Sequence, residues 1–467
     1  MAKQTLFDKI WDAHTVVEFS GGWALMHIDR NLLHDLSGTV GLRELQRRNI
    51  PVLAPELAYA TPDHAVSSAP GRDGSTFSGG AMLYEDLRRL SRKAGIAFFD
   101  LGESGHGIVH VIAPELGIVQ PGTTVICGDS HTCTNGALGA IAFGVGASEL
   151  MHSLATQTLL QRRPKNMRVH FEGSLATGVS AKDLILHAIA ILGANAGTGY
   201  AIEYTGDCVA RMSIEERMTL CNLSIEMGSK IGMIAPDEKT FAYLKGRQYA
   251  PEGALFAQAV AHWKTLFTDD DAVFDRVERV DASAAQPMIT WGTSPEHAMA
   301  IGATIPLASS CDDAERRKNW TSAQSYMGVV GGEPIVGLRI DRVFIGSCTN
   351  ARLSDLREAA FHVAGKQVAS GVVAWIVPGS EDVKLAAEAE GLDGIFKAAG
   401  FEWREPGCSM CAASNGERGV PQERVLSTTN RNFVGRQGPG VRTHLVSPAT
   451  AAISAIAGVI RDPRVGV

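Results

Sequence analysis

The residues with the clearest chemical potential are three cysteines in the last third of the chain. Cys408 and Cys411 form a C-x-x-C pair within residues 405–418, EPGCSMCAASNGER, and Cys348 lies in residues 344–350, FIGSCTN. A structural zinc site normally has four ligands, whereas three thiolates leave one metal position open, where a substrate can bind. The distant Cys348 follows an apolar strand pattern and a glycine, which favours a metal site.

The cysteine pair has alternative interpretations. A C-x-x-C pair also occurs by chance, in redox motifs and in zinc knuckles. A thioredoxin-like pair begins a helix near the start of a small domain, but this pair lies late in a long chain, after Pro406 and Gly407. A zinc ribbon needs a second C-x-x-C pair, which the chain lacks. A zinc protein that uses the same cysteines structurally stays open on the residues alone.

An acidic and histidine-rich turn follows the strongest strand pattern of the first half. Residues 123–127, TTVIC, are β-branched and apolar and predict a strand. Asp129, Ser130 and His131 come directly after it. Because ligands in open α/β sheets bind beyond the carboxyl ends of strands, this turn is well placed for chemistry. The structural alternative is a polar turn in which Asp129 or Ser130 caps a helix.

Two further segments carry histidine near predicted strand ends. Residues 60–66, ATPDHAV, hold Asp63 beside His64, and residues 107–111, GIVHV, hold His110 after a strand pattern at residues 97–101. An isolated Asp-His dipeptide is most often a surface loop. The Asp-His pair is stronger evidence for a functional site here, because other acidic and histidine side chains follow neighbouring predicted strands.

One helix is marked at both ends. Ser213 and Glu216 form a capping-box pattern, and Gly228 is the expected end of the helix. Asn222 and Glu226 are four residues apart, so we expect both to project from one flank of this helix. On a surface helix they would be solvated, whereas beside an apolar stripe they can reach into a cleft.

The chain alternates between predicted strands and helices, which favours α/β subdomains with parallel sheets. Residues 136–160 read as a glycine- and alanine-rich helix, and residues 281–325 as a long connection with few elements. We expect three α/β subdomains, at residues 1–165, 166–290 and 291–467.

The composition excludes several functional classes. The chain has 467 residues, 45% of them apolar and 20% charged, as in an ordinary globular protein. Its net charge of −7 and its lack of a basic run argue against nucleic acid as a partner. Residues 445–460 are uncharged but too short to span a bilayer. Eight cysteines in so long a chain are no disulfide framework, and with no visible signal peptide the cytoplasm is the expected setting.

Four motifs together resemble the aconitase superfamily. They are GDSHT at 128–132, GSCTN at 346–350, PGCSMC at 406–411 and NRNFVGR at 430–436. The resemblance covers essentially the whole chain and is strongest with the large subunits of the bacterial isopropylmalate dehydratase branch. It implies three aconitase-type α/β/α subdomains around a central cleft, and a hydro-lyase that isomerises 2-isopropylmalate to 3-isopropylmalate through 2-isopropylmaleate.

The resemblance also implies a cofactor and a set of site residues. Cys348, Cys408 and Cys411 would hold a [4Fe–4S] cluster with one iron that no cysteine ligates. That iron would act as a Lewis acid on a small hydroxy-dicarboxylate. Motif matching implies catalytic roles for Asp63, His64, His110, Asp129, His131 and Glu226, and substrate contacts for Ser130, Asn222, Asn430, Arg431 and Arg436.

Two departures from the family pattern shape the remaining expectations. The chain ends at Val467 without the swivelling domain of single-chain aconitases, so we expect a separate small subunit that carries it. Ala65, the segment at 103–107 and Glu417 differ from the isopropylmalate pattern, so a paralogue acting on citraconate, maleate or dimethylmaleate is the alternative. Some relatives bind RNA after losing their cluster, but the cysteines and the acidic net charge argue against that class.

Overall fold

The computed structural model describes residues 3–465, which pack into two compact units. Each unit is assembled from separated pieces of sequence, so the chain passes from one to the other several times. Unit 1 comprises Met1–Val66, Gly74–Gly173 and Asn195–Asp281, and unit 2 comprises Ser67–Asp73, Ser174–Ala194 and Ala282–Val467. Among the described residues, no helix has the length and apolar character needed to cross a membrane.

Unit 1 contains a five-stranded parallel sheet with the strand order β5-β4-β3-β6-β7. The chain winds outward in both directions from the neighbouring strands β3 and β6, and sheets of this kind bind ligands beyond the carboxyl ends at that reversal. The strands are β3 (Arg30–His34), β4 (Ala58–Thr61), β5 (Ala97–Phe98), β6 (Thr124–Cys127) and β7 (Ile141–Gly144), and the associated helices are α2 (Ser37–Arg48), α3 (Ser78–Ala94), α4 (Val109–Glu115) and α5 (Ala147–Thr156).

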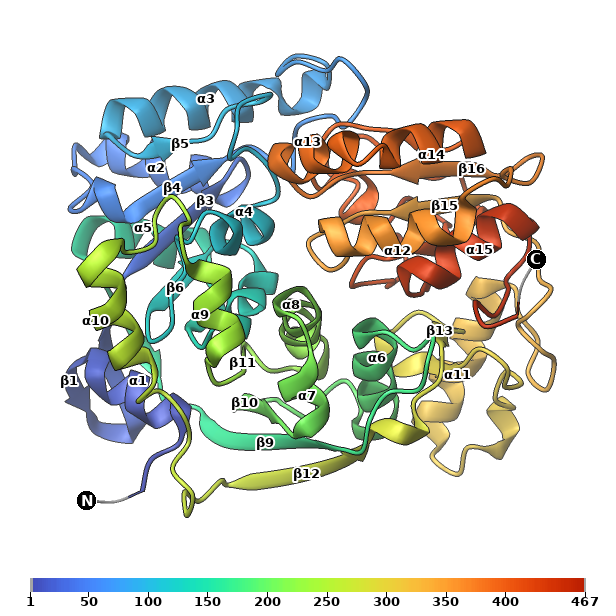
Figure 1. The fold of residues 1–467 in the computed structure, drawn as a ribbon, viewed down its shortest axis with the longest axis horizontal. Coiled ribbons are helices and arrows are strands. Elements are labelled where there is room, and N and C mark those ends of the chain that lie inside the picture. Colours follow the sequence, from blue (N-terminus) through green and yellow to red (C-terminus); the bar gives the residue numbers. More distant parts are fainter. Residues whose placement is uncertain (1–2, 466–467) are drawn as a thin grey trace. The chain divides into compact units, whose positions relative to one another are not determined.

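Unit 1 also holds a four-stranded parallel sheet, in which β9 and β12 run side by side (Figure 1). Its order is β11-β10-β9-β12, with β9 (Lys165–Glu172), β10 (Tyr200–Thr205), β11 (Ile231–Met233) and β12 (Arg276–Asp281) and the helices α7 (Asp207–Arg211), α8 (Ile214–Asn222), α9 (Glu238–Leu244) and α10 (Gly253–Trp263). A small antiparallel sheet follows α1 (Leu6–His14) and consists of β1 (Thr15–Phe19), β2 (Trp23–His27) and β8 (Thr158–Arg162).

Unit 2 repeats the winding of the first sheet, with the parallel order β17-β16-β15-β18-β19. The apolar run of β15 (Arg342–Ile345) is buried along its whole length, as a central parallel strand should be. The other strands are β16 (Val373–Ile376), β17 (Glu402–Trp403), β18 (Arg424–Ser427), β19 (Arg442–Leu445) and the hairpin of β13 (Met288–Thr290) and β14 (Ala298–Ala300). The helices are α6 (Ala181–Leu192), α11 (Ala314–Met327), α12 (Leu353–Val363), α13 (Glu381–Ala389), α14 (Leu392–Ala399) and α15 (Pro448–Ala457).

The predicted α/β class with parallel sheets is confirmed, but several local predictions are wrong. His110 does not follow a strand end directly, because it lies in α4, which begins at Val109 and is buried from Val109 to Pro114. A short buried apolar run does not by itself show which element carries the histidine. Residues 136–160 are not one helix but contain β7, α5 and the start of β8, with Gly139 in the left-handed region and Gly146 capping α5.

The helix that opens at Ser213 has the predicted capping box and ends at Gly228, which has φ 82°. Its regular α-helical part stops at Asn222, and the following turn, η4 (Leu223–Met227), is a 3₁₀ helix. Because a 3₁₀ helix has three residues per turn, Asn222 and Glu226 do not share one flank in the predicted way. Residues 281–325 are also richer in structure than expected, since they contain the β13–β14 hairpin and most of α11.

Candidate functional site

The predicted site residues fall into two sets, one in each unit. In unit 1, Asp63 and His64 follow β4, and Asp129 follows β6. His64 Nδ1 lies 2.5 Å from Asp63 Oδ1, and His64 Nε2 lies 3.3 Å from Asp129 Oδ2. Two strand-end motifs that are distant in the sequence therefore share one buried imidazole.

Asp129 joins several histidines. Its Oδ1 accepts a hydrogen bond from the backbone N–H of His131 at 2.7 Å and lies 3.1 Å from His110 Nε2. Burial alone raises the pKa of Asp129, but hydrogen bonds from the surrounding histidines hold it well below its usual range. Asp129 is therefore a stable carboxylate anion. Burial lowers the pKa of His110 despite the pull of Asp129, which favours a neutral ring that donates from Nε2.

The network continues from His131 to the turn after α8. His131 Nε2 lies 3.0 Å from Glu226 Oε1. Ser130 Oγ lies 3.5 Å from His131 Nδ1, and Asn222 donates from Nδ2 to Thr134 Oγ1 at 2.8 Å. Carboxylates and imidazoles therefore alternate from Asp63 to Glu226, an arrangement that can hold and relay protons.

Asp35 supports this network and was not found from the sequence. Its carboxylate is fully buried and accepts hydrogen bonds from the backbone N–H groups of His64 at 3.0 Å and Ala65 at 2.7 Å. The ring of His34 packs on that of His64, with centroids 4.3 Å apart. The signal that could have found the pair is its position directly after β3, at the reversal of the sheet.

In unit 2, Cys348 follows β15, and Cys408 and Cys411 lie at η8 (Ser409–Cys411); all three are buried. Ser347 Oγ lies 3.2 Å from Cys411 Sγ and 3.9 Å from Cys348 Sγ. Asn430, which follows β18, donates from Nδ2 to Cys348 Sγ at 3.5 Å, and its Oδ1 lies 3.9 Å from Cys411 Sγ. The two distant cysteines thus converge on the same two polar side chains.

The donor set fits an iron–sulfur cluster better than a single zinc ion. Among the described residues, one group of three or more histidine, cysteine or acidic ligand atoms lies within 4.8 Å of one another, and it lies at residues 34, 35, 63 and 64. Three thiolates are one fewer than the four ligands of a structural zinc site. Hydroxyl and amide groups beside the sulfurs are typical of iron–sulfur sites. At residues 34–64 both oxygens of Asp35 already accept backbone hydrogen bonds, so that group is structural support.

Backbone strain occurs beside two of the cysteines. Ser347 has φ 80° and Ser409 has φ 49°, a left-handed conformation that few residues other than glycine adopt. Such strain persists only where surrounding contacts hold it, and it clusters at functional sites. Here the hydroxyl contacts of both serines stabilise these conformations. Ser347 Oγ contacts Cys411 Sγ, and Ser409 Oγ donates to Glu417 at 2.6 Å.

Glu417 anchors the loop that carries the cysteine pair. Burial alone raises the pKa of Glu417, but the positive charge of Arg404 and the hydrogen bonds hold it below its usual range. The sequence marked Glu417 only as a departure from the family pattern. Its carboxylate oxygens accept from Ser67 Oγ at 2.8 Å, Ser68 N at 2.7 Å, Ser68 Oγ at 2.6 Å, Arg404 NH2 at 2.8 Å and Asn415 Nδ2 at 2.9 Å.

A fully buried lysine lies close to the cysteines and was also not found from the sequence. Lys182, in α6, donates from Nζ to the carbonyls of Thr428 at 3.0 Å and Thr429 at 2.5 Å, just before Asn430. Burial lowers the pKa of Lys182 to about 7, against the pull of the thiolates of Cys411 and Cys348. Its position in an apolar helix pattern hid it from sequence reasoning.

The two predicted arginines follow Asn430. Arg431 and Arg436 are half-buried, and Arg436 NH2 lies 3.9 Å from Cys411 Sγ. The Nε–H of Arg436 is buried and has no acceptor among the described residues. A buried guanidinium donor without an acceptor is suited to binding a carboxylate from outside the chain.

Known proteins match this chain over almost its whole length. The aconitase family (aconitate hydratase) matches residues 8–458. The 3-isopropylmalate dehydratase large subunit 1 of Bradyrhizobium diazoefficiens is 56% identical over 461 residues, covering 99% of this chain and 96% of that protein. The 3-isopropylmalate dehydratase large subunit of Roseiflexus castenholzii is 50% identical over 466 residues, covering 99% of both.

Among solved structures, holo-form aconitase X of Thermococcus kodakaraensis has a TM-score of 0.46 at 14% identity, covering 87% of this chain and 84% of that one. The extent of the family match and the high identity of the two dehydratase subunits are decisive. This chain belongs to the aconitase family.

Proposed function

We propose that this chain is the large, catalytic subunit of a 3-isopropylmalate dehydratase, a hydro-lyase of leucine biosynthesis that converts 2-isopropylmalate to 3-isopropylmalate through 2-isopropylmaleate. Two relatives with this name, at 56% and 50% identity, support it. The observation that carries the proposal is the alternation of carboxylates and imidazoles from Asp63 to Glu226. Dehydration followed by rehydration needs groups that give and take protons at two neighbouring carbons.

In this proposal His64 protonates the departing hydroxyl. Its ring lies between the carboxylates of Asp63 and Asp129, at 2.5 Å and 3.3 Å, so both stabilise the charged imidazolium. Asp35 fixes the backbone of His64, and so limits the positions from which Nε2 can transfer its proton. His110, neutral and hydrogen-bonded to Asp129, keeps that carboxylate oriented.

His131 and Glu226 hold the water that is removed and returned. Their 3.0 Å contact places an acceptor and an ionisable ring together, and Asp129 fixes the backbone of His131. Ser130 and Asn222 line the same part of the network. Their hydroxyl and amide groups suit hydrogen bonds to the substrate.

Cys348, Cys408 and Cys411 would hold a [4Fe–4S] cluster in unit 2. When bound, a cluster with one iron free of cysteine supplies a Lewis acid for the substrate hydroxyl and carboxylate. Asn430 donates to sulfur, which tunes such a cluster. Arg431 and Arg436 would bind substrate carboxylate, since the Nε–H of Arg436 needs an acceptor.

The proposal includes a partner. Both relatives are named large subunits, and this supports a small subunit, which we propose carries the swivelling domain. The three-subdomain division at residues 1–165, 166–290 and 291–467 and the cytoplasmic setting belong to the same proposal. Glu417 has a structural role in the cysteine loop. Its difference from the family pattern therefore does not require a different substrate.

The test is a substrate comparison on anaerobically purified protein co-expressed with the small subunit. We expect hydration and dehydration of 2-isopropylmalate and 2-isopropylmaleate with kcat/KM at least about 100-fold above that for citraconate, maleate or dimethylmaleate. A preference for citraconate, maleate or dimethylmaleate would show that the chain is the paralogue that acts on that acid. About four iron and four sulfide per chain, with a three-iron EPR signal after mild oxidation, is the matching result for the cofactor.

A further inference from the structure

A cavity in unit 1 lies apart from the strand ends that carry Asp63 and Asp129. It has a volume of about 760 Å³, within the roughly 300–1,000 Å³ of small-molecule sites. It lies at the amino ends of the neighbouring parallel strands β9, β10 and β11, whereas the proton-transfer network follows the carboxyl ends of β4 and β6. Phe143 of β7, a strand of the same sheet as β4 and β6, also lines the cavity, but Asp63, His64 and Asp129 do not.

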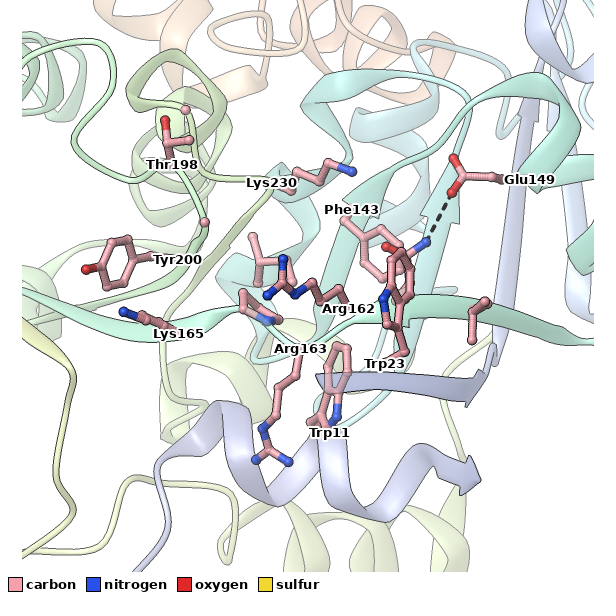
Figure 2. A pocket seen from close by; sticks show the side chains of 16 residues that line it. Trp11, Trp23, Phe143, Glu149, Arg162, Arg163, Lys165, Thr198, Tyr200 and Lys230 are labelled. Atoms are coloured by element: carbon pink, nitrogen blue, oxygen red, sulfur yellow. Dashed lines mark hydrogen bonds between the residues drawn. The ribbon is translucent and has the colours of Figure 1, made fainter. Parts of the chain in front are cut away.

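The cavity gathers positive charge in a chain whose net charge is −7. Arg162, Lys165 and Lys230 line it, and all three are exposed. Throughout residues 3–465 none of them has a hydrogen-bonded or ion-paired acid. Figure 2 shows the Arg162 side chain in the middle of the lining residues, with Lys230 and Lys165 also labelled. Unpaired cations around a hollow concentrate anions there.

The other charged lining residues have partners within the chain, Arg163 in ion pairs and Glu149 in hydrogen bonds to neutral groups. Arg163 is paired with Asp8 at 2.7 Å and Asp12 at 2.6 Å. Glu149 accepts from Gln161 Nε2 at 3.1 Å, the bond drawn as a dashed line in Figure 2. These pairs fix the wall and leave the three unpaired cations to meet a ligand.

Aromatic side chains supply the remaining walls. Trp23 and Tyr200 line the cavity, and Trp23 is 43% exposed, which is unusual for so large an apolar ring. Trp11 and Phe143 add apolar surface (Figure 2). Exposed aromatic faces beside cations suit a ligand that combines a flat ring with negative charge.

We propose that this cavity binds a ring-bearing polyanion of the nucleotide type, with the ring against Trp23 or Tyr200 and the anionic groups against Arg162, Lys165 and Lys230. The site is separate from the proposed isomerase chemistry and takes no part in it. It gives the chain a second ligand site. Binding of a charged metabolite to this site can be measured without measuring turnover.

The test is isothermal titration calorimetry of the full chain with ADP as the probe and with adenosine and pyrophosphate as its separated parts. We expect ADP to bind with a Kd below about 1 mM and both parts to bind more weakly. Arg162→Glu and Lys230→Glu should each raise the Kd about tenfold or more, and added salt should weaken binding. Trp23→Ala should weaken ADP but not pyrophosphate.

Lys245→Glu is the matched control, because Lys245 is an exposed cation of the same unit that lies outside the cavity and has no ion pair among the described residues. It should leave ADP binding unchanged. The proposal is overturned if ADP does not bind, if Arg162→Glu binds ADP as the unaltered chain does, or if pyrophosphate binds as tightly as ADP. Because turnover is not measured, failure here leaves the isomerase proposal standing.

Discussion

Nδ1 of His64 lies 2.5 Å from Oδ1 of Asp63, and both side chains are buried. Burial alone raises the pKa of Asp63, but the charge and hydrogen bond of His64 lower it, so this carboxylate is ionised beside an imidazole. The second oxygen of Asp63 accepts from the backbone N–H of Val109 at 3.0 Å. The pair is therefore fixed in place and electrostatically complementary.

Asp63→Asn tests this pair. The amide keeps the volume but removes the negative charge that stabilises the His64 imidazolium, so we expect kcat to fall about 10²–10⁴-fold. Iron and sulfide content should stay at the level of the unaltered protein, because the cysteines lie in unit 2. Turnover within a factor of two of the unaltered enzyme would remove Asp63 from the proton-transfer network.

Cys348→Ser tests the proposed ligand set. Loss of one thiolate should remove most of the iron and sulfide from anaerobically purified protein, as measured by metal analysis and absorbance. Cys127→Ser is the control, because burial raises the pKa of the Cys127 thiol well above its usual range and keeps it protonated. Full iron content in Cys348→Ser would show that the ligands are other residues.

Lys182→Met tests the buried lysine. Methionine fills a similar volume but cannot donate, so two buried carbonyls lose their hydrogen bonds. We therefore expect the free energy of unfolding of the apo-protein to fall by about 1–3 kcal/mol, and a chelator to remove iron faster. The reason is that Thr428 and Thr429 lose the ammonium that fixes them next to Asn430. Lys245→Met is the matched control, and equal iron loss in both variants would exclude a role for Lys182 in cluster retention.

Glu417→Ala should destabilise the chain more than any other single change in the cysteine loop. It would remove one of the two carboxylates that pair with the buried Arg404, at 2.8 Å, and would leave several buried donors without their acceptor, at a cost of about 1–3 kcal/mol. Glu417→Gln keeps most hydrogen bonds and should lose less. Denaturant unfolding of the two variants gives the comparison, and a Glu417→Ala loss of under about 1 kcal/mol would mean that the loop is held by other contacts.

His14 should make stability depend on pH through Asp29, at 2.8 Å from its Nε2. Burial lowers the pKa of His14, but Asp29 outweighs it and raises that pKa above 6.5. The stabilisation from the charged ring is fully present below pH 6.5 and is lost as pH rises through the raised value. His14→Gln cannot titrate, so its melting temperature should lie further below that of the unaltered chain at pH 6 than at pH 9. An equal gap at both values would contradict this linkage.

The sequence predicted the parts of the site that depend on local pattern. The strand at β6, the Asp-Ser-His turn after it and the capping box at Ser213 are set by neighbouring residues, and all are present. His110 was expected near a strand end, but it lies in α4, because an apolar run of five residues fits either element once it is buried.

The supporting residues depend on distant partners, which the local sequence does not show. Lys182 lies in an apolar helix, where a lysine is usually expected at the solvent-exposed edge. It is buried because it donates to the carbonyls of the turn after β18, which is distant in the sequence. Asp35 has an ordinary local sequence, and its function is set by backbone N–H groups of His64 and Ala65. Such roles become visible only when the sheet brings the segments together.

The hydrogen bond from Ser68 Oγ to Glu417, 2.6 Å long, joins residues 349 positions apart. A ribosome adds roughly 5–20 residues per second, so Glu417 is synthesised roughly 20–70 s after Ser68. The loop with the cysteine pair is therefore anchored only after residue 417 has been synthesised. A chain rich in such distant contacts folds slowly and exposes unfinished surface meanwhile. Truncation before residue 417 would leave the much earlier segment at Ser67 and Ser68 without the carboxylate that it binds.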